Sequence, residues 1–215
     1  MKFEKIYNKG QSQLFRYSFL EFFTKSHPLI IWGMYLPLAV WMIYYASAYE
    51  RLKTGTLILI FFAGLFFWTF FEYVVHRFVF HWVSDRPGMQ KFTYIIHGNH
   101  HHYPRDKQRL LMPPLPSVII SSSIFGLMYL SMKVYAFVFF PGFIVGYLLY
   151  GTMHYAIHSW PPPAKWLKPL WRNHHFHHYD SDEKGFGVSS VLWDWVFGTM
   201  SEKSKKVSKA ADRPV

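Results

Sequence analysis

Histidines gather in four short clusters along this chain, and no other feature of the sequence restricts its possible folds as strongly. The spacing H-x-x-H-H occurs twice, in HGNHHHYPRD at residues 97–106 and in HHFHH at residues 174–178. Histidine pairs also end the segments HRFVFH, at residues 76–81, and HYAIH, at residues 154–158. Helix positions three and four apart share one face, so most of these spacings predict helices that point their imidazoles at one place. The pair in HRFVFH is five residues apart, roughly 140° around an ideal helix, and therefore needs a helix that bends or ends there, or a wide site.

The two H-x-x-H-H spacings and the two pairs account for ten of the 13 histidines, and they predict a dinuclear metal site. Neutral imidazole is the commonest protein ligand for zinc, copper, iron and nickel, and the chain has no cysteine to compete. One ion usually takes about four to six ligands, so ten histidines suit two ions. A lone histidine is more often a core or surface residue, and a histidine-rich tract can be a loose surface site, but four spaced clusters fit neither description. The predicted ligands are His76, His81, His97, His100, His101, His154, His158, His174, His177 and His178.

The composition predicts a membrane protein. Of the 215 residues, 51% are hydrophobic, 21% are aromatic and only 16% are charged, which is typical of a chain that lies partly in hydrocarbon and partly in the membrane interface. The formal charge of +11 in so apolar a chain indicates contact with anionic lipid rather than with nucleic acid. Residues 1–27 are basic and lack the apolar core of a secretory signal, so we expect targeting by the first membrane span.

Four uncharged runs are candidates for membrane crossings. Residues 28–48 have the length that crosses a bilayer core, and residues 54–71 form a second run that continues towards the first histidine pair. Residues 117–132 and 134–151 are parted only by Lys133, and each is short for a full crossing. They form either a tight helical hairpin, which we favour, or two segments that dip into the membrane and return.

The distribution of lysine and arginine predicts the orientation of these runs. The N-terminal arm and the histidine-bearing segments carry 20 of them, and the two links between paired runs carry three. This asymmetry places both termini and all four clusters in the cytoplasm. The predicted fold is an all-α integral membrane protein with about four transmembrane helices in two hairpins, capped by a cytosolic helical domain that holds the dinuclear site. We expect a basic amphipathic arm over residues 1–27, the membrane and cap domain over 28–200, and a flexible charged tail over 201–215.

Ligation by nitrogen alone leaves two chemistries open. Iron could activate dioxygen and cut an unactivated C–H bond, whereas zinc could activate water for hydrolysis. The sequence lacks the H-E-x-x-H motif of zinc hydrolases and the E-x-x-H motif of ferritin-like di-iron proteins. Ten histidines therefore favour an oxygenase. No catalytic residue is predicted beyond the metal centre, although Tyr155, Tyr179 and Asp180 lie beside the clusters and are candidates for contact with a head group or with a ligand's second nitrogen.

The clusters and their flanks resemble the histidine boxes of the membrane-bound fatty acid hydroxylase superfamily, most closely its fatty acid 2-hydroxylase branch. The resemblance covers about residues 70–200 and is carried by HRFVFH, HGNHHHYPRD, HYAIH and HHFHHYDSDEKGFGVSSVLWDWVFGT. It implies two metal ions, taken to be iron in the active enzyme, on the ten boxed histidines, and it leaves His27, His102 and His175 outside the ligand set. It also implies a monooxygenase that hydroxylates the 2-position of a fatty acyl chain, free or ceramide-linked, with dioxygen and external electrons.

Other functions with a similar site stay open at this point. A lipid desaturase, or a sterol or carotenoid hydroxylase, uses similar histidine clusters. A metal transporter would need ionisable residues inside its spans, and these runs are nearly free of them. Many eukaryotic relatives carry a haem domain ahead of the membrane part, where this chain has a short basic arm, so we expect a separate reductase, ferredoxin or cytochrome as electron donor. The small size and the absence of a lysine-rich retrieval signal favour a bacterial inner membrane over the endoplasmic reticulum, and we expect zinc to replace iron readily in purified samples.

Overall fold

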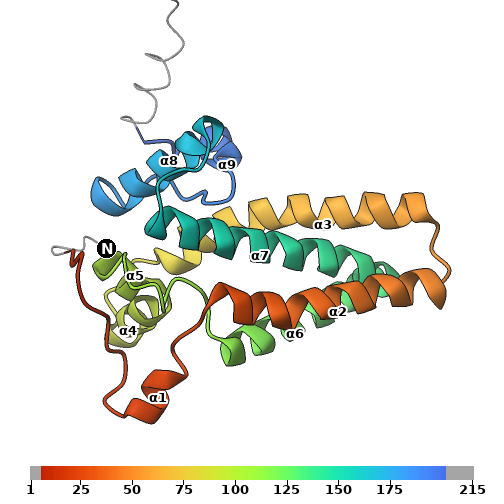
Figure 1. Ribbon diagram of the computed structural model, residues 1–215, viewed down its shortest axis with the longest axis horizontal. Helices are drawn as coiled ribbons and strands as arrows, with labels where there is room; N and C mark the ends of the chain where they lie inside the picture. Colours follow the sequence, from red (N-terminus) through yellow and green to blue (C-terminus); the bar gives the residue numbers. More distant parts are fainter. Residues whose placement is uncertain (1–5, 202–215) are drawn as a thin grey trace, which may run out of the picture. The chain divides into compact units, whose positions relative to one another are not determined.

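In the computed structural model, which describes residues 6–201, every regular element of the described part is helical (Figure 1). The prediction of an all-α protein is confirmed. Residues 1–5 of the predicted arm and residues 202–215 of the predicted tail lie outside the described residues. The elements are α1 (Ser18–Phe22), α2 (Pro28–Ala48), α3 (Thr54–Val75), η1 (His76–Phe80), α4 (Pro87–Thr93), η2 (Tyr94–Gly98), α5 (Asn99–His102), α6 (Pro114–Met132), η3 (Lys133–Tyr135), α7 (Ala136–Ser159), η4 (Lys165–Leu167), α8 (Lys168–Tyr179) and α9 (Leu192–Val196).

The described chain divides into two compact units. The membrane unit comprises residues 13–70 and 108–152, and the histidine unit comprises residues 6–12, 71–107 and 153–201. All ten predicted ligands fall in the histidine unit. The domain boundaries predicted from the sequence stay predictions.

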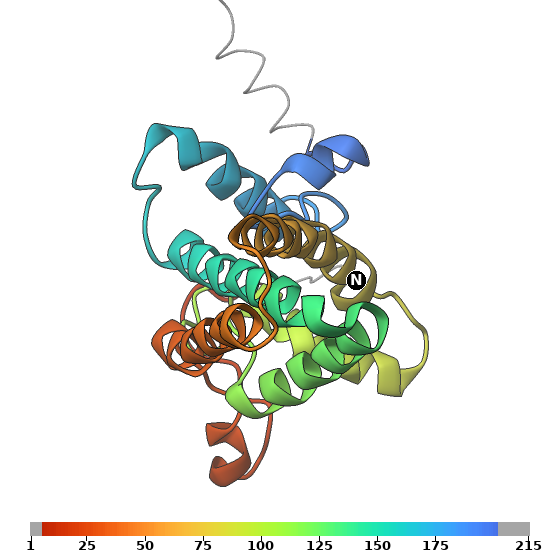
Figure 2. The same cartoon turned by 90° about the vertical axis from the view of Figure 1, so that its right-hand side faces the viewer.

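Four long helices make up the membrane unit, and they run side by side in both views (Figures 1 and 2). The Tyr35 hydroxyl of α2 is 2.8 Å from that of Ser117 in α6, and the ring of Trp68 in α3 packs 4.9 Å from that of Phe143 in α7. Phe143 and its neighbour Ile144 are almost fully buried, so α7 contributes much of the unit's core. The helices hold together through aromatic packing, with a few hydroxyl contacts between polar groups that would otherwise lie in an apolar environment.

Two glycines let α3 and α7 approach each other closely. A Cβ atom added at Gly64 would fall on the carbonyl oxygen of Phe139, and one added at Gly142 would fall on the carbonyl oxygen of Phe61. Small residues at a helix crossing allow such backbone contact inside a membrane bundle. The two backbones therefore touch where α3 and α7 cross.

Three helical stretches are long and apolar enough to cross a membrane, namely Pro28–Ala48, Thr54–Phe80 and Pro114–Ser159. The third contains both α6 and α7, which are joined at Lys133, a residue with a φ of 51°. A bend at this residue is compatible with a hairpin, and four crossings stay a prediction.

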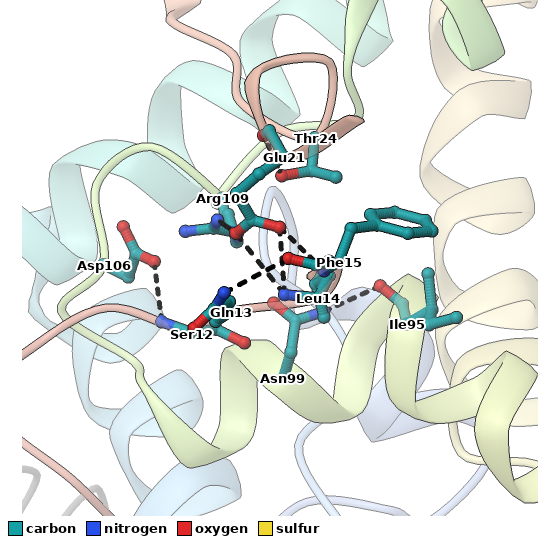
Figure 3. A network of polar contacts seen from close by, with 10 residues as sticks. All are labelled: Ser12, Gln13, Leu14, Phe15, Glu21, Thr24, Ile95, Asn99, Asp106 and Arg109. Carbon is teal, nitrogen blue, oxygen red and sulfur yellow. Dashed lines mark hydrogen bonds and ion pairs between the residues drawn. The ribbon is translucent and has the colours of Figure 1, made fainter. Parts of the chain in front are cut away.

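The basic and aromatic segment before α2 is folded against the loop that precedes α6. The Glu21 carboxylate accepts hydrogen bonds from the backbone N–H groups of Leu14, at 3.1 Å, and Phe15, at 2.8 Å, and it forms an ion pair with the buried Arg109 (Figure 3). The Ser26 N–H donates to the carbonyl of Gln108 at 2.8 Å. These contacts fix the path of residues 13–27, and the predicted place of the arm at a membrane surface stays a prediction.

Candidate metal centre

The ring nitrogens of the ten predicted ligands come together in two groups of five, within 4.8 Å of one another in each group. Group A consists of His76, His81, His97, His101 and His177. Group B consists of His100, His154, His158, His174 and His178. Neither group contains His27, His102 or His175; the His27 ring instead accepts from the Leu29 N–H at the start of α2, at 3.2 Å.

The two H-x-x-H-H boxes contribute to the groups in opposite ways. In the first box, His97 and His101 belong to group A and His100 belongs to group B. In the second box, on α8, His174 and His178 belong to group B and His177 belongs to group A. Residues four apart on a helix are stacked on one face, and the residue between them points to the side. Each box therefore supplies a pair to one group and a single ligand to the other, which interlocks the two groups.

The five-residue spacing in HRFVFH is accommodated by a change of helix winding. Helix α3 ends at Val75 and continues as the π-turn η1, in which the His81 N–H donates to the His76 carbonyl at 3.3 Å. A π-turn closes hydrogen bonds between residues five apart and is common at functional sites. The two rings lie 5.1 Å apart between centroids. The regular α-helix ends before His76, and the π-turn that follows brings both rings into group A.

The distances between ring nitrogens fit shared metal ions. In group A, the Nε2 atom of His97 is 3.1 Å from that of His76 and 3.0 Å from that of His101. In group B, the Nε2 atom of His174 is 2.8 Å from that of His158 and 3.1 Å from that of His178. Two nitrogens that bind one ion at about 2.1 Å and at a right angle are about 3.0 Å apart. Each group thus has the spacing of ligands around one ion.

Buried nitrogens without partners point to the same conclusion. The Nε2 atoms of His81 and His177 in group A are buried and have no hydrogen-bond partner. A buried polar atom left unpaired costs free energy, and a bound metal would remove that cost. The donor set therefore fits a metal ion.

Burial also keeps the ligands in the protonation state that metals need. It lowers the pKa of His177 to about 4, although the hydrogen bond to the Lys184 carbonyl acts in the opposite direction. Burial, with the charges of neighbouring imidazoles, lowers the pKa of His97 and His101 in group A and of His174 and His178 in group B well below the usual value. Neutral imidazole is the form that binds metals, so the groups are ready for ligation at neutral pH.

A loop after α8 orients two ligands of group A. The Nδ1 atom of His177 donates to the Lys184 carbonyl at 2.9 Å, and that of His76 donates to the Phe186 carbonyl. A ring nitrogen that faces a carbonyl must carry the proton, which leaves Nε2 as the metal-binding atom. Residues 184–186 therefore set the tautomer of both rings.

Two buried carboxylates hold this loop in place. Asp194 accepts from the N–H groups of Phe186, at 2.9 Å, and Gly187, at 2.8 Å. Glu72 accepts from the N–H groups of Val188, at 2.7 Å, and Ser189, at 2.9 Å. A carboxylate that accepts two backbone donors fixes the local chain path firmly, so both act on group A through the loop.

Sequence reasoning missed the part played by Asn173, which is fully buried. Its Nδ2 atom donates to Asp194 at 3.0 Å, and the Thr199 hydroxyl donates to the same carboxylate at 2.7 Å.

The chain is also tightly packed at Gly187, whose N–H donates to Asp194. A Cβ atom added at Gly187 would fall on the Ser190 carbonyl oxygen, so there is no room for a larger residue. The motifs G-F-G-V, at residues 185–188, and W-D-W, at residues 193–195, were the sequence signal that could have indicated this buried network.

The three residues proposed beside the clusters lie outside both groups of nitrogens. The Tyr155 ring packs 5.5 Å from that of Trp160, and Tyr179 is exposed and donates its hydroxyl hydrogen to Asn8 at 3.0 Å. Asp180 is exposed at the end of α8. Their roles stay predictions.

One ligand in each group is only partly buried and lines an open cavity. His81 of group A lines a cavity of 340 Å³, together with Phe78 and Trp82. His158 of group B lines a cavity of 1060 Å³, together with Trp160 and Arg172. Each group thus has one ligand that a molecule in the adjoining cavity can approach.

Residues 61–199 match the sequence model of the family described as fatty acid hydroxylase. The chain belongs to this family. It is 36% identical over 198 residues to dihydroceramide fatty acyl 2-hydroxylase FAH1 of Arabidopsis thaliana, covering 92% of this chain and 83% of the relative. It is 35% identical over 207 residues to ceramide very long chain fatty acid hydroxylase SCS7 of Saccharomyces cerevisiae, covering 94% of this chain and 53% of that relative.

A solved structure of full-length scs7p, with only the hydroxylase domain visible, has the same fold. It superposes with a TM-score of 0.83 at 32% sequence identity, covering 96% of this chain and 75% of that one. The predicted family is therefore confirmed. The protein is an integral membrane, lipid-modifying hydroxylase and thus an oxidoreductase, with histidine clusters that could bind metal.

Proposed function

We propose that the protein is a di-iron monooxygenase that hydroxylates carbon 2 of a fatty acyl chain, either free or linked to a sphingolipid such as ceramide. The observation that carries this proposal is the pair of interlocked groups, whose ten members are all histidines. A donor set of imidazole nitrogens suits redox-active iron. The 2-position and the sphingolipid class are supported by the names of the relatives, which are acyl 2-hydroxylases and ceramide hydroxylases.

In this proposal, group A and group B each bind one iron ion through their five histidines. Iron bound there would supply the activation of dioxygen with external electrons. The chain's own residues hold the rings in place, keep them neutral and shield them from bulk water. Burial of eight of the ten rings does the shielding, and the partly buried His81 and His158 leave room for the substrate. The acyl chain must be clamped with one carbon towards the metals, because orientation decides which C–H bond reacts.

The remaining parts of the proposal come from the sequence. An oxygenase of this kind needs external electrons, and the proposal includes a reductase, ferredoxin or cytochrome as their donor. A cytoplasmic site, cytoplasmic termini and contacts from Tyr155, Tyr179 or Asp180 to the head group belong to the same proposal. The relatives named above come from a plant and a yeast, so the preference for a bacterial inner membrane rests on the sequence alone.

Lipid mass spectrometry on cells that express the protein tests the proposal. The variant with both His100→Ala and His177→Ala removes one ligand from each group, and His102→Ala is a matched control next to His101 but outside both groups. We expect acyl chains heavier by one oxygen at carbon 2 with the wild type and with the control, and none with the double variant. Iron and zinc contents are measured on the same proteins, since zinc replaces iron easily.

Other outcomes would overturn the assignment in defined ways. A loss of two hydrogens would indicate a desaturase, and oxygen at another carbon, or on a sterol or carotenoid, would indicate a different hydroxylase. An unchanged lipid profile in iron-loaded cells with a competent reductase would contradict the proposed reaction.

A further inference from the structure

The cavity beside His158 is strongly basic. It is lined by Arg105, Lys107, Lys168 and Arg172, and none of its lining residues is an aspartate or a glutamate. Within residues 6–201, no ion pair joins any of these four side chains to a carboxylate. Cations that converge on one space repel one another and attract an anion. The cavity therefore favours a negatively charged occupant.

Further contacts show that the basic groups form the cavity wall. The Nε atom of Arg172 is buried and has no hydrogen-bond partner. The Lys107 ammonium lies 6.0 Å from the centre of the Trp160 ring, at a distance where a cation and an aromatic face attract each other. The Tyr179 hydroxyl, which also lines the cavity, is held by Asn8. Guanidinium and ammonium groups beside aromatic walls suit an oxygen anion carried by an amphiphilic molecule.

The position of this cavity matches what hydroxylation at carbon 2 requires. Carbon 2 is bonded directly to the acyl carbonyl carbon, so the head group must lie immediately beside the metal centre. His158, a proposed ligand, is part of the cavity wall. A head group in this cavity would therefore be adjacent to group B.

The cavity beside His81 differs in size and in charge. It measures 340 Å³, and Arg77 is the basic residue among its lining residues besides His81. Arg77 already donates to the Tyr73 hydroxyl at 2.9 Å and lies 4.9 Å from the ring centre of Phe78. A charged head group is thus better matched to the cavity at His158.

We propose that the cavity of Arg105, Lys107, Lys168 and Arg172 binds the anionic head group of the substrate. This inference rests on the proposed function and deepens it. The substrate class is a lipid with a carboxylate or a phosphate next to the acyl carbonyl region, such as a free fatty acid or a phosphorylated sphingolipid, in preference to a neutral ceramide. Guanidinium and ammonium groups bind both anions through charge-assisted hydrogen bonds.

A direct binding measurement tests this inference without turnover. The metal-loaded full chain in zwitterionic lipid nanodiscs is titrated with labelled hexadecanoate or hexadecanol, and with ceramide or ceramide 1-phosphate. We expect the anionic member of at least one pair to bind at least about tenfold more tightly, with a preference that falls as salt is added. The pair that shows the preference identifies carboxylate or phosphate as the head group.

Two lysine substitutions, one inside the cavity and one outside it, test whether the cavity itself binds the anion. Lys168→Gln should weaken binding of the anionic lipid by about tenfold, whereas Lys165→Gln, three residues earlier, exposed and outside the cavity, should leave it unchanged. Binding of the neutral lipid should be the same in both variants. Equal affinity for charged and neutral lipids would overturn the inference, and so would an equal loss in both variants, which would indicate general attraction to the surface.

Turnover separates this inference from the proposed function. With the anionic lipid, Lys168→Gln should raise KM by about tenfold and leave kcat nearly unchanged, because the side chain binds substrate in the ground state. If the protein hydroxylated carbon 2 of neutral ceramide with no charge preference in binding, only this inference would fail. If Lys168→Gln changed the dependence of rate on an acidic redox protein and left lipid binding unchanged, the cavity would serve the electron donor and the inference would be overturned.

Discussion

Groups A and B each consist of five histidines, but the protein orients them by different means. In group A, the Nδ1 atoms of His76 and His177 donate to backbone carbonyls of the loop at residues 184–186. In group B, the Nδ1 atoms of His100, His174 and His178 are buried without a hydrogen-bond partner. Helical spacing places the two pairs of group B, since His154 and His158 lie on α7 and His174 and His178 lie on α8. Helical spacing therefore does more of the positioning in group B, whereas loop carbonyls hold the first histidine of the π-turn in group A.

The largest expected effect comes from removing one ligand from each group in turn. His177→Ala and His178→Ala alter neighbouring residues that belong to different groups. Each variant should lower the metal content from two ions to one per chain and reduce hydroxylation by at least about 100-fold, because ligand loss costs more than loss of an outer hydrogen bond. Elemental analysis and product mass spectrometry check both. Loss of both ions in either variant would show that the two groups do not bind metal independently.

The loop anchors should matter to group A alone. Asp194→Asn replaces an acceptor of two backbone N–H groups and should loosen the loop that holds His76 and His177. In the His178→Ala background, where group A is the intact site, we expect metal affinity to fall by about 10- to 100-fold.

A matched background and a control make this test specific. In the His177→Ala background, where group B is intact, Asp194→Asn should leave affinity unchanged. The exposed Asp85→Asn should change neither background. Chelator competition measures each affinity, and equal losses in the two backgrounds would contradict the division of roles.

Acid should destabilise the metal-free protein through the buried imidazoles. Burial lowers the pKa of His177 to about 4, whereas a histidine in the unfolded chain has a pKa of about 6.5. Between these values the unfolded chain binds a proton that the folded chain does not, so stability falls as pH is lowered from about 6.5 to about 4. The slope is at most about 1.4 kcal/mol per pH unit for each such histidine, and above about pH 7.5 there should be no change from this cause.

Denaturation of the metal-free protein across this pH range provides the measurement. His177→Gln should make the acid slope shallower, since glutamine does not titrate. An unchanged slope would show that His177 does not contribute.

The smallest effect is expected in the membrane unit and should leave the metal centre intact. Gly142→Ala places a methyl group against the Phe61 carbonyl and should destabilise the crossing of α3 and α7 by about 1–3 kcal/mol. Gly126→Ala, in α6, meets no atom within 4 Å and should be neutral or slightly stabilising. Thermal unfolding in detergent compares them, and metal content should stay at two ions per chain. Loss of metal from folded Gly142→Ala protein would contradict this expectation.

The sequence was sufficient to predict the features that depend on local spacing. Apolar runs indicated the long helices, and the interval of five residues from His76 to His81 indicated a break in the regular helix. Which group each histidine joins depends on how α5 and α8 pack, and spacing within one box does not reveal that. The anchors at Lys184 and Phe186 are backbone carbonyls, so their side chains gave no signal. The ion pair between Glu21 and Arg109 joins segments that are distant in sequence, and nothing local to either residue predicts it.

The π-turn at HRFVFH also relates the spacings of the two histidine pairs. A π-turn is an α-helix with one extra residue in one turn, so HRFVFH and HYAIH differ by a single residue between their histidines. In the π-turn the extra residue is taken up within the turn, so the second imidazole stays on the same side as the first and both rings join group A. Deletion of one residue between His76 and His81 would remove the π-turn and give this pair the four-residue interval of HYAIH.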